Sequence, residues 1–230
     1  MGELWHLDAT DQARLIRTGR ASAREVVASA LARLEAVNPQ INAVVQFMAE
    51  EALAAADAAD AKRARGEALA PLHGVPVTVK VNTDQVGYAT TNGIVAFKDA
   101  VAKEDAPVVT NMRAAGGVIV GRTNVPAFSM RAFSDNALHG RTLNPLEPTV
   151  SPGGSSGGAE ASVAVGIGAI AHGNDIAGSV RVPAMYNGVV GLRPSLGRVP
   201  AFNPSQQVAR PFGSQMMSVQ GAHTSTPRLN

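Results

Sequence analysis

A lysine inside a run of β-branched residues is the first feature of this sequence that suggests chemistry. Lys80 lies in Val75-Pro-Val-Thr-Val-Lys-Val81, whereas the other lysines stand beside charged residues. The run predicts a short strand, and alternation places Lys80 and Thr78 on one face and the valines on the other. Burial would favour the neutral amine, which can act as a base near neutral pH. The alternative is a lysine at a strand end that extends its amine to water.

A glycine-rich loop, Ser151-Pro-Gly-Gly-Ser-Ser-Gly-Gly158, offers serine hydroxyls. It does not fit a phosphate-binding loop, because no Lys followed by Ser or Thr comes after the glycines. Residues 154–158 also match the Gly-x-Ser-x-Gly turn of α/β-hydrolases, in which Ser156 would be the nucleophile with Asp175 and His223 as partners. That turn follows a strand, and the Pro-Gly pair here predicts none, so we rank this interpretation second.

A second serine follows small residues in Asn174-Asp-Ile-Ala-Gly-Ser-Val-Arg-Val-Pro183. Small residues before Ser179 let successive backbone N–H groups turn toward one point, as the oxyanion of an acyl-transfer reaction requires. Alone, Ala-Gly-Ser is a common turn. Together with Lys80 and the 151–158 loop, it supplies the parts of a Ser-Ser-Lys relay.

These residues must be positioned by helices and strands, and three helices are expected within residues 8–65 because each has its own start or stop signals. They run from a cap at Asp8 to Gly19, from a capping box at Ser22-Ala-Arg-Glu25 to Asn38-Pro39, and from Glu50 to Arg65.

From Pro71 onward, strand patterns alternate with helix patterns. The strand that holds Lys80 is followed by a helix that starts at Asp105 and Pro107 and by a short apolar strand, Val118-Ile-Val120. This alternation predicts an α/β sheet covered on both faces. From about Asn203 no hydrophobic periodicity typical of a helix or a strand is sustained, and loop or disorder is expected there.

The composition excludes several kinds of protein. The chain has 230 residues, a net charge of +2 and no cysteine, so disulfides, thiolate nucleophiles and cysteine metal sites are excluded. The five histidines are isolated, which predicts no metal site, and we expect them at the surface or as caps. The balanced charge indicates neither nucleic acid nor membrane as partner, and the lack of a signal sequence or long apolar run indicates a cytoplasmic protein.

Three blocks of the sequence resemble the amidase signature family: Gly74–Asn82, Ser151–Gly158, and Asn174–Pro183 continuing into Gly191-Leu-Arg-Pro194. The resemblance covers most of residues 1–220. It implies one α/β domain with a mixed β-sheet core and helices on both faces, the helical segment 1–65 forming its N-terminal part. The fold is expected to be incomplete at its C-terminus.

The resemblance also implies an activity, the hydrolysis of a small carboxylic amide to the acid and ammonia or an amine through a serine acyl-enzyme, without cofactor or metal. In this numbering, Lys80 resembles the general base, Ser155 the bridging serine after a cis peptide bond to Gly154, and Ser179 the nucleophile. The implied oxyanion donors are the backbone N–H groups of Ile176, Ala177, Gly178 and Ser179. The supporting residues are Gly154, Ser156, Asp175 and Arg181, the last two as an ion pair that braces the loop.

The sequence departs from the family pattern at two positions and in its length. Val81 stands where many members have Asp, and Ala177 where glycine is usual. Family enzymes are also longer. The resemblance fades after Val219-Gln-Gly221, so residues 221–230 are expected to be a disordered tail left by truncation or a changed reading frame.

A shortened sheet would expose an unpaired edge and an apolar patch, so we expect a second copy or another partner to cover that edge. The alternatives to an active amidase are an inactive fragment or binding module and, less favoured, an α/β-hydrolase esterase or an amidotransferase subunit.

Overall fold

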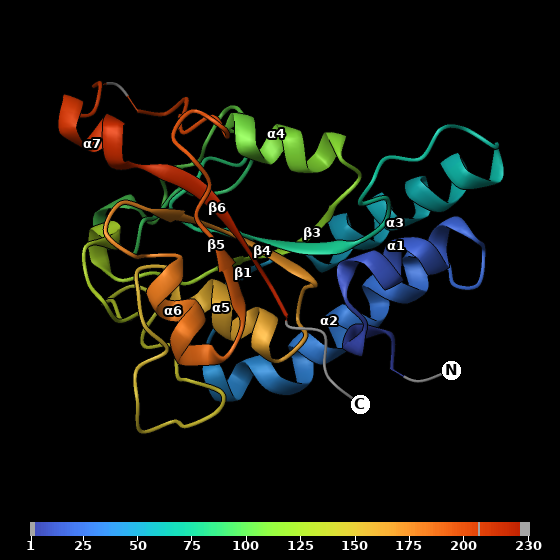
Figure 1. Cartoon of the computed structure of the whole chain (residues 1–230), viewed down its shortest axis with the longest axis horizontal. Helices are drawn as coiled ribbons and strands as arrows, with labels where there is room; N and C mark the ends of the chain where they lie inside the picture. Colours follow the sequence, from blue (N-terminus) through green and yellow to red (C-terminus); the bar gives the residue numbers. More distant parts are fainter. Residues whose placement is uncertain (1–2, 207, 226–230) are drawn as a thin grey trace.

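The computed structural model describes residues 3–206 and 208–225 (Figure 1). Its α-helices are α1 Ala9–Arg17, α2 Ala23–Ile41, α3 Ala49–Ala64, α4 Pro107–Ala114, α5 Gly157–Ala164, α6 Arg181–Asn187 and α7 Phe212–Met217. Its strands are β1 Val44–Phe47, β2 Pro76–Lys80, β3 Val118–Thr123, β4 Ile170–Asp175, β5 Val190–Leu192 and β6 Val219–Thr224. Three short 3₁₀ turns are η1 Leu4–His6, η2 Val95–Phe97 and η3 Ala127–Ser129.

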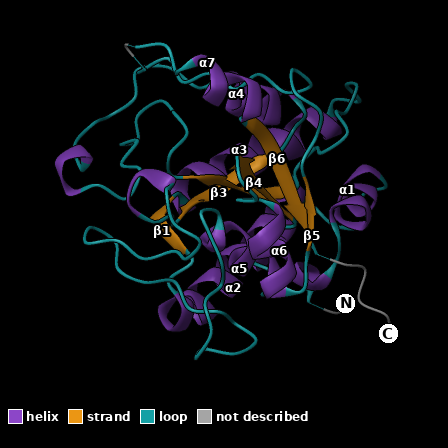
Figure 2. Cartoon of the chain, turned by 60° about the vertical axis from the view of Figure 1, so that its left-hand side comes forward, coloured by secondary structure: helices purple, strands orange, loops and turns teal. Residues whose placement is uncertain are grey.

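The six strands form one mixed sheet in the order β1-β3-β2-β4-β6-β5. Strands β3, β2 and β4 are parallel, whereas β1, β6 and β5 join by antiparallel pairing. Figure 2 shows α4 and α7 on one side of the sheet and α2, α5 and α6 on the other. The expected α/β class, a mixed sheet covered by helices on both faces, is confirmed.

The first helices begin where their caps predicted. The Asp8 carboxylate accepts a hydrogen bond from the Asp11 backbone N–H at the start of α1. At the start of α2, Ser22 and Glu25 form the reciprocal capping box, each side chain accepting from the other residue's backbone N–H. These local hydrogen bonds satisfy N–H groups that the helix itself leaves unpaired.

The predicted end of α2 is wrong. The helix continues through Pro39 to Ile41 and stops at Asn42, which adopts a left-handed conformation. The buried Asn38 side chain accepts from the backbone N–H groups of Ala43 and Val44 and donates to the Val44 carbonyl. These bonds turn the chain into β1, a strand that the helical pattern of residues 8–65 concealed.

Strand β2 carries the predicted alternation. Val77 and Val79 pack in a core cluster with Val108 and Val109 of α4. On the other face, the Thr78 hydroxyl lies 3.4 Å from the Ser162 hydroxyl of α5. All five residues of β2 are buried because helices cover both faces of the sheet.

The C-terminal segment is more ordered than its sequence predicted. Helix α7 and strand β6 follow Asn203, and β6 lies inside the sheet between β4 and β5. The expected tail at 221–230 is therefore wrong for residues 221–224, while 226–230 lie outside the described residues. The physical reason is that antiparallel pairing with β4, from Asp175↔Val219 to Ile170↔Thr224, uses backbone groups that any sequence supplies.

Strand β5 is at one edge of the described sheet and pairs with β6. Its Val190 and Leu192 side chains are exposed, as is Met185 of the neighbouring α6. The expected exposed edge is thus present, and its coverage by a partner stays a prediction. No helix in the described part of the chain is long and apolar enough to cross a membrane.

Candidate active site

The side chain of Lys80 is completely buried at the end of β2. Its Nζ lies 2.7 Å from Ser155 Oγ, 2.9 Å from Ser156 Oγ and 2.9 Å from Asn174 Oδ1. Burial lowers the pKa of Lys80 to about 7, even though two nearby carboxyl groups act in the opposite direction. The alternative of a lysine that reaches water is therefore wrong, because α5 covers this face of the strand.

The loop that carries Ser155 and Ser156 requires glycine where other backbone atoms pack closely against it. The Gly154–Ser155 peptide bond is cis, as the resemblance implied. A Cβ on Gly154 would lie 2.5 Å from the Arg131 carbonyl oxygen and 2.6 Å from the Phe133 nitrogen, so no larger residue fits. The loop then leads directly into α5, which starts at Gly157.

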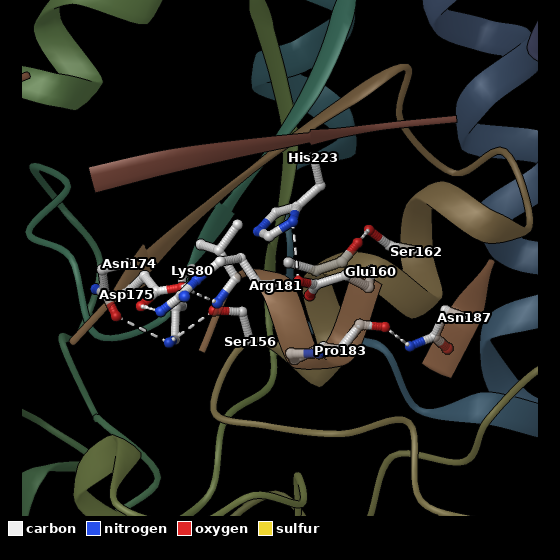
Figure 3. A network of polar contacts seen from close by, with 12 residues as sticks. Lys80, Ser156, Glu160, Ser162, Asn174, Asp175, Arg181, Pro183, Asn187 and His223 are labelled. Carbon is white, nitrogen blue, oxygen red and sulfur yellow. Dashed lines mark hydrogen bonds and ion pairs between the residues drawn. The ribbon is translucent and has the colours of Figure 1, made fainter. Parts of the chain in front are cut away.

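Asp175 organises the loop that carries Ser179. Its buried carboxylate accepts from the backbone N–H groups of Gly178 and Val180 and forms a two-point pair with the Arg181 guanidinium at 3.0 Å. Burial by itself would raise the pKa of Asp175, but these hydrogen bonds outweigh it and lower the pKa to about 2. The predicted Asp175–Arg181 ion pair is confirmed. Figure 3 shows both side chains beside Lys80 and Asn174.

The same contacts limit the predicted oxyanion donors. Because the N–H of Gly178 donates to Asp175, it is already committed to bracing the loop. The remaining predicted donors are the N–H groups of Ile176, Ala177 and Ser179. Gly178 has a φ of 103°, a conformation that favours glycine, and this explains why the chain has glycine immediately before Ser179.

Ser155 and Ser179 line the same cavity, which has a volume of about 710 Å³. Polar side chains of Asn82, Asn92, Ser129 and Asn174 form part of its wall. An apolar part consists of Phe97, Val101, Phe128, Met130 and Ile176. The rings of Phe97 and Phe128 meet edge to face, with centroids 6.4 Å apart. The cavity can therefore accept a substrate that has an apolar body and a polar reacting group.

A buried glutamate and a buried histidine, Glu160 and His223, lie near Lys80. His223 reaches from β6 to Glu160 on α5 (Figure 3), with 2.9 Å between Nδ1 and Oε1. Burial raises the pKa of Glu160 well above its usual range and lowers that of His223 to about 3, so His223 is neutral near pH 7.

The expectation that the histidines lie at the surface or as caps is wrong for three of them. His73, His172 and His223 are buried, and burial lowers the pKa of His172 to about 4. The structure also does not assemble the alternative triad of Ser156, Asp175 and His223. Ser156 contacts Lys80, Asp175 pairs with arginine and His223 pairs with Glu160.

Sequence reasoning missed two asparagines. Asn174 contacts Lys80, and Asn82 exchanges hydrogen bonds with Asn174. Both lie within blocks that had been singled out, Asn82 two residues after Lys80 and Asn174 immediately before Asp175. Their connection depends on the parallel pairing of β2 with β4, which no local pattern reveals.

Comparison with known proteins agrees with the fold. The Amidase family model matches residues 25–216. The chain is 53% identical over 220 residues to an indoleacetamide hydrolase of Bradyrhizobium diazoefficiens, covering 96% of this chain and 42% of that protein. It is also 42% identical to a glutamyl-tRNA(Gln) amidotransferase subunit of Moorella thermoacetica, over 86% of this chain and 40% of that protein.

Among solved structures, a bacterial aryl acylamidase of the amidase signature family superimposes with a TM-score of 0.87 and 34% identity, covering 95% of this chain and 44% of that one. The chain thus spans about two fifths of the length of the curated relatives it matches.

Proposed function

Since this chain belongs to the amidase signature family, we propose that it hydrolyses a carboxylic amide through an acyl-enzyme on Ser179. The observation that carries the proposal is the contact of 2.7 Å between the buried Lys80 amine and Ser155, whose hydroxyl shares a cavity with Ser179. A lysine with its ordinary pKa would be protonated near pH 7 and could not act as a base. Because burial lowers the pKa of Lys80 to about 7, the neutral amine is available to take a proton.

In the proposed reaction, Lys80 takes the proton of Ser155, and Ser155 takes the proton of Ser179 as Ser179 Oγ bonds to the amide carbon. The carbonyl oxygen becomes an oxyanion and accepts hydrogen bonds from the backbone N–H groups of Ile176, Ala177 and Ser179. The carbon–nitrogen bond then breaks. The leaving nitrogen receives a proton from Ser155, which regains one from the Lys80 ammonium.

Water completes the cycle by the same route. It gives a proton to Ser155 as it attacks the acyl carbon, and the carboxylic acid leaves when Ser179 regains its proton. The Asp175–Arg181 pair would hold the Ser179 loop in place through both steps without exchanging protons, because the pKa of Asp175 keeps it ionised near neutral pH.

For the substrate we propose a primary amide with an aromatic group near the carbonyl. The edge-to-face pair of Phe97 and Phe128 in the cavity wall supports this class, because flat rings pack well against such pairs. The names of the relatives, an indoleacetamide hydrolase and an aryl acylamidase, agree with an aromatic substrate.

Labelling with a fluorophosphonate tests the nucleophile. We expect the intact mass of the wild-type chain to rise by one probe adduct, and the Ser179→Ala variant to show none. The adduct should form slowly in Lys80→Met, because the base is lost while the nucleophile remains. Full labelling of Ser179→Ala would show that another residue is the nucleophile.

A second candidate is the glutamine-hydrolysing role of an amidotransferase subunit, which the identity of 42% to such a subunit supports. Release of ammonia from phenylacetamide by the monodisperse chain supports the amidase. Hydrolysis of glutamine that requires added partner subunits supports the amidotransferase. Labelling without turnover of either substrate supports the inactive fragment or binding module.

A further inference from the structure

The hydrogen-bonding partners of Lys80 determine where its lone pair points. A neutral amine has two N–H donors and one lone pair, and a side-chain amide oxygen can only accept. Asn174 Oδ1, at 2.9 Å, therefore takes one N–H. If Ser156 Oγ, also at 2.9 Å, takes the other, the lone pair is left for the hydroxyl of Ser155 at 2.7 Å.

This arrangement works only while Asn174 presents its oxygen to Lys80. A half-turn of the amide would place an NH₂ group there, which cannot accept from the amine. Asn82 opposes that turn, since Asn174 Nδ2 donates to Asn82 Oδ1 at 3.0 Å and Asn82 Nδ2 donates back to Asn174 Oδ1 at 3.3 Å.

The orientation of Asn82 is determined by the cavity wall. Ser129 Oγ donates to Asn92 Oδ1 at 2.7 Å, so its single proton is used. It must therefore accept from Asn82 Nδ2, which lies 2.9 Å away. The direction of every hydrogen bond from Asn92 to Lys80 then follows, and each asparagine in this series of bonds lines the cavity.

We propose that Asn174 and Asn82 are positioning residues: Asn82 holds the Asn174 amide with its oxygen on Lys80, and so directs the lone pair of the amine at Ser155. The inference deepens the proposed function, since it rests on Lys80 as the base. It adds a link between the cavity wall at Ser129 and the proton-transfer step.

The titratable groups that face Lys80 set the background for a pH measurement. They are Glu160 on α5, His172 and Asp175 on β4, and His223 on β6. The alanine variants below change none of these groups, so a changed titration of Lys80 in them reports on the asparagines.

Two readouts test the proposal in the intact chain. The first is the titration of ¹³Cε-labelled lysine by NMR, which is tractable because the chain has only Lys62, Lys80, Lys98 and Lys103, and Lys80→Met assigns the signal. The second is the pH profile of kcat and KM for phenylacetamide. The variants are Asn174→Asp, Asn174→Ala, Asn82→Ala and the double alanine variant.

Asn174→Asp keeps an oxygen beside the amine but adds a negative charge, so the pKa of Lys80 and the acid limb of the pH profile should both move upward. Asn82→Ala removes no atom in contact with Lys80. It should still lower kcat by about tenfold to a hundredfold with little change in KM, because the base is misaligned.

The double variant distinguishes a chain of contacts from separate effects. If Asn82 acts through Asn174, the double alanine variant loses no more kcat than Asn174→Ala alone. Losses that multiply would overturn the proposal. Asn38→Ala is the matched control, because Asn38 is a buried asparagine of α2 whose side chain bonds to Ala43 and Val44 and not to Lys80 or Asn174. This variant should lower stability without moving the Lys80 titration.

The NMR titration does not require turnover, so the two proposals can fail separately. A wild-type chain that hydrolyses no amide, while Asn174→Asp and Asn82→Ala shift the Lys80 signal, would reject the proposed function and keep the positioning role. An active wild type whose Asn82→Ala and Asn174→Asp variants keep its kcat, pH profile and Lys80 signal would reject the positioning role. Asn174→Asp changes no side-chain shape, so it remains informative if an alanine variant unfolds.

Discussion

The Lys80 amine lies 2.7 Å from the Ser155 hydroxyl at a point where Lys80 is completely shielded from solvent. A strand end alone would allow the amine to reach water. Helix α5 prevents this, and the resulting loss of hydration makes the protonated form unfavourable. The contact therefore has consequences that can be measured with titration, mutation and unfolding experiments.

The first prediction concerns pH. Because burial lowers the pKa of Lys80 to about 7, the neutral fraction rises as pH increases through that value. We expect kcat/KM for phenylacetamide to fall about tenfold for each pH unit below it. Lys80→Met should lower kcat by about 10²-fold to 10⁴-fold, whereas Lys98→Met, at an exposed lysine, should match the wild type. An acid limb near pH 4 would instead point to a carboxylate base.

The second prediction concerns the brace on the Ser179 loop. Asp175→Ala leaves two buried backbone N–H groups unpaired and removes the partner of Arg181. We expect the free energy of unfolding in urea to fall by about 2–4 kcal/mol. Arg181→Ala should cost about 1 kcal/mol or less, because half of that side chain is exposed and screened by water. Equal losses for the two variants would contradict the assignment of the N–H contacts as the main effect.

The third prediction concerns substrate choice. Phe97→Ala removes one ring of the edge-to-face pair in the cavity wall. We expect KM for phenylacetamide to rise about threefold to tenfold, which corresponds to the usual worth of an aromatic contact, with little change for propionamide. Phe47→Ala is the control, since that exposed ring lies on β1 outside this cavity. A similar rise in KM for both amides would show that the ring only shapes the cavity.

The fourth prediction concerns the buried Glu160–His223 pair. Burial raises the pKa of Glu160, so between its unfolded value near 4.5 and its folded value the native state holds a proton that the unfolded state has lost. This contribution makes the wild type less stable as pH rises. Glu160→Gln removes it, so the stability of the variant relative to the wild type should increase as pH rises above about 4.5 in urea titrations. A relative loss over that range would mean that Glu160 is ionised in the folded chain.

Much of the fold was predictable because its signals are local. The Asp8 cap, the Ser22–Glu25 box and the alternation in β2 each depend on residues within one or two turns or on one strand. The end of α2 was mispredicted because Asn38 reaches across to Val44, a contact that overrides the usual effect of Pro39. Strand β6 was missed because pairing with β4 requires no particular side chains.

The candidate site, like the fold, could be predicted only in part from the sequence. The order and spacing of the three sequence blocks were sufficient to single out Lys80, Ser155 and Ser179, and the catalytic roles of these residues stay predictions. Asn174, in contrast, is separated from Lys80 by 94 positions in the sequence, and His223 by 63 from Glu160. Only the tertiary structure brings these side chains together.

The sequence by itself determined which groups are available, a lysine in an apolar strand, serines beside glycines and a carboxylate before a tight turn. Only the tertiary structure decided their state and direction. Whether the Lys80 amine is neutral depends on the helix that buries it, and where its lone pair points depends on an asparagine in the neighbouring strand. The physical reason is that charge and hydrogen-bond geometry depend on what lies within a few ångströms in space, and strand register sets those neighbours.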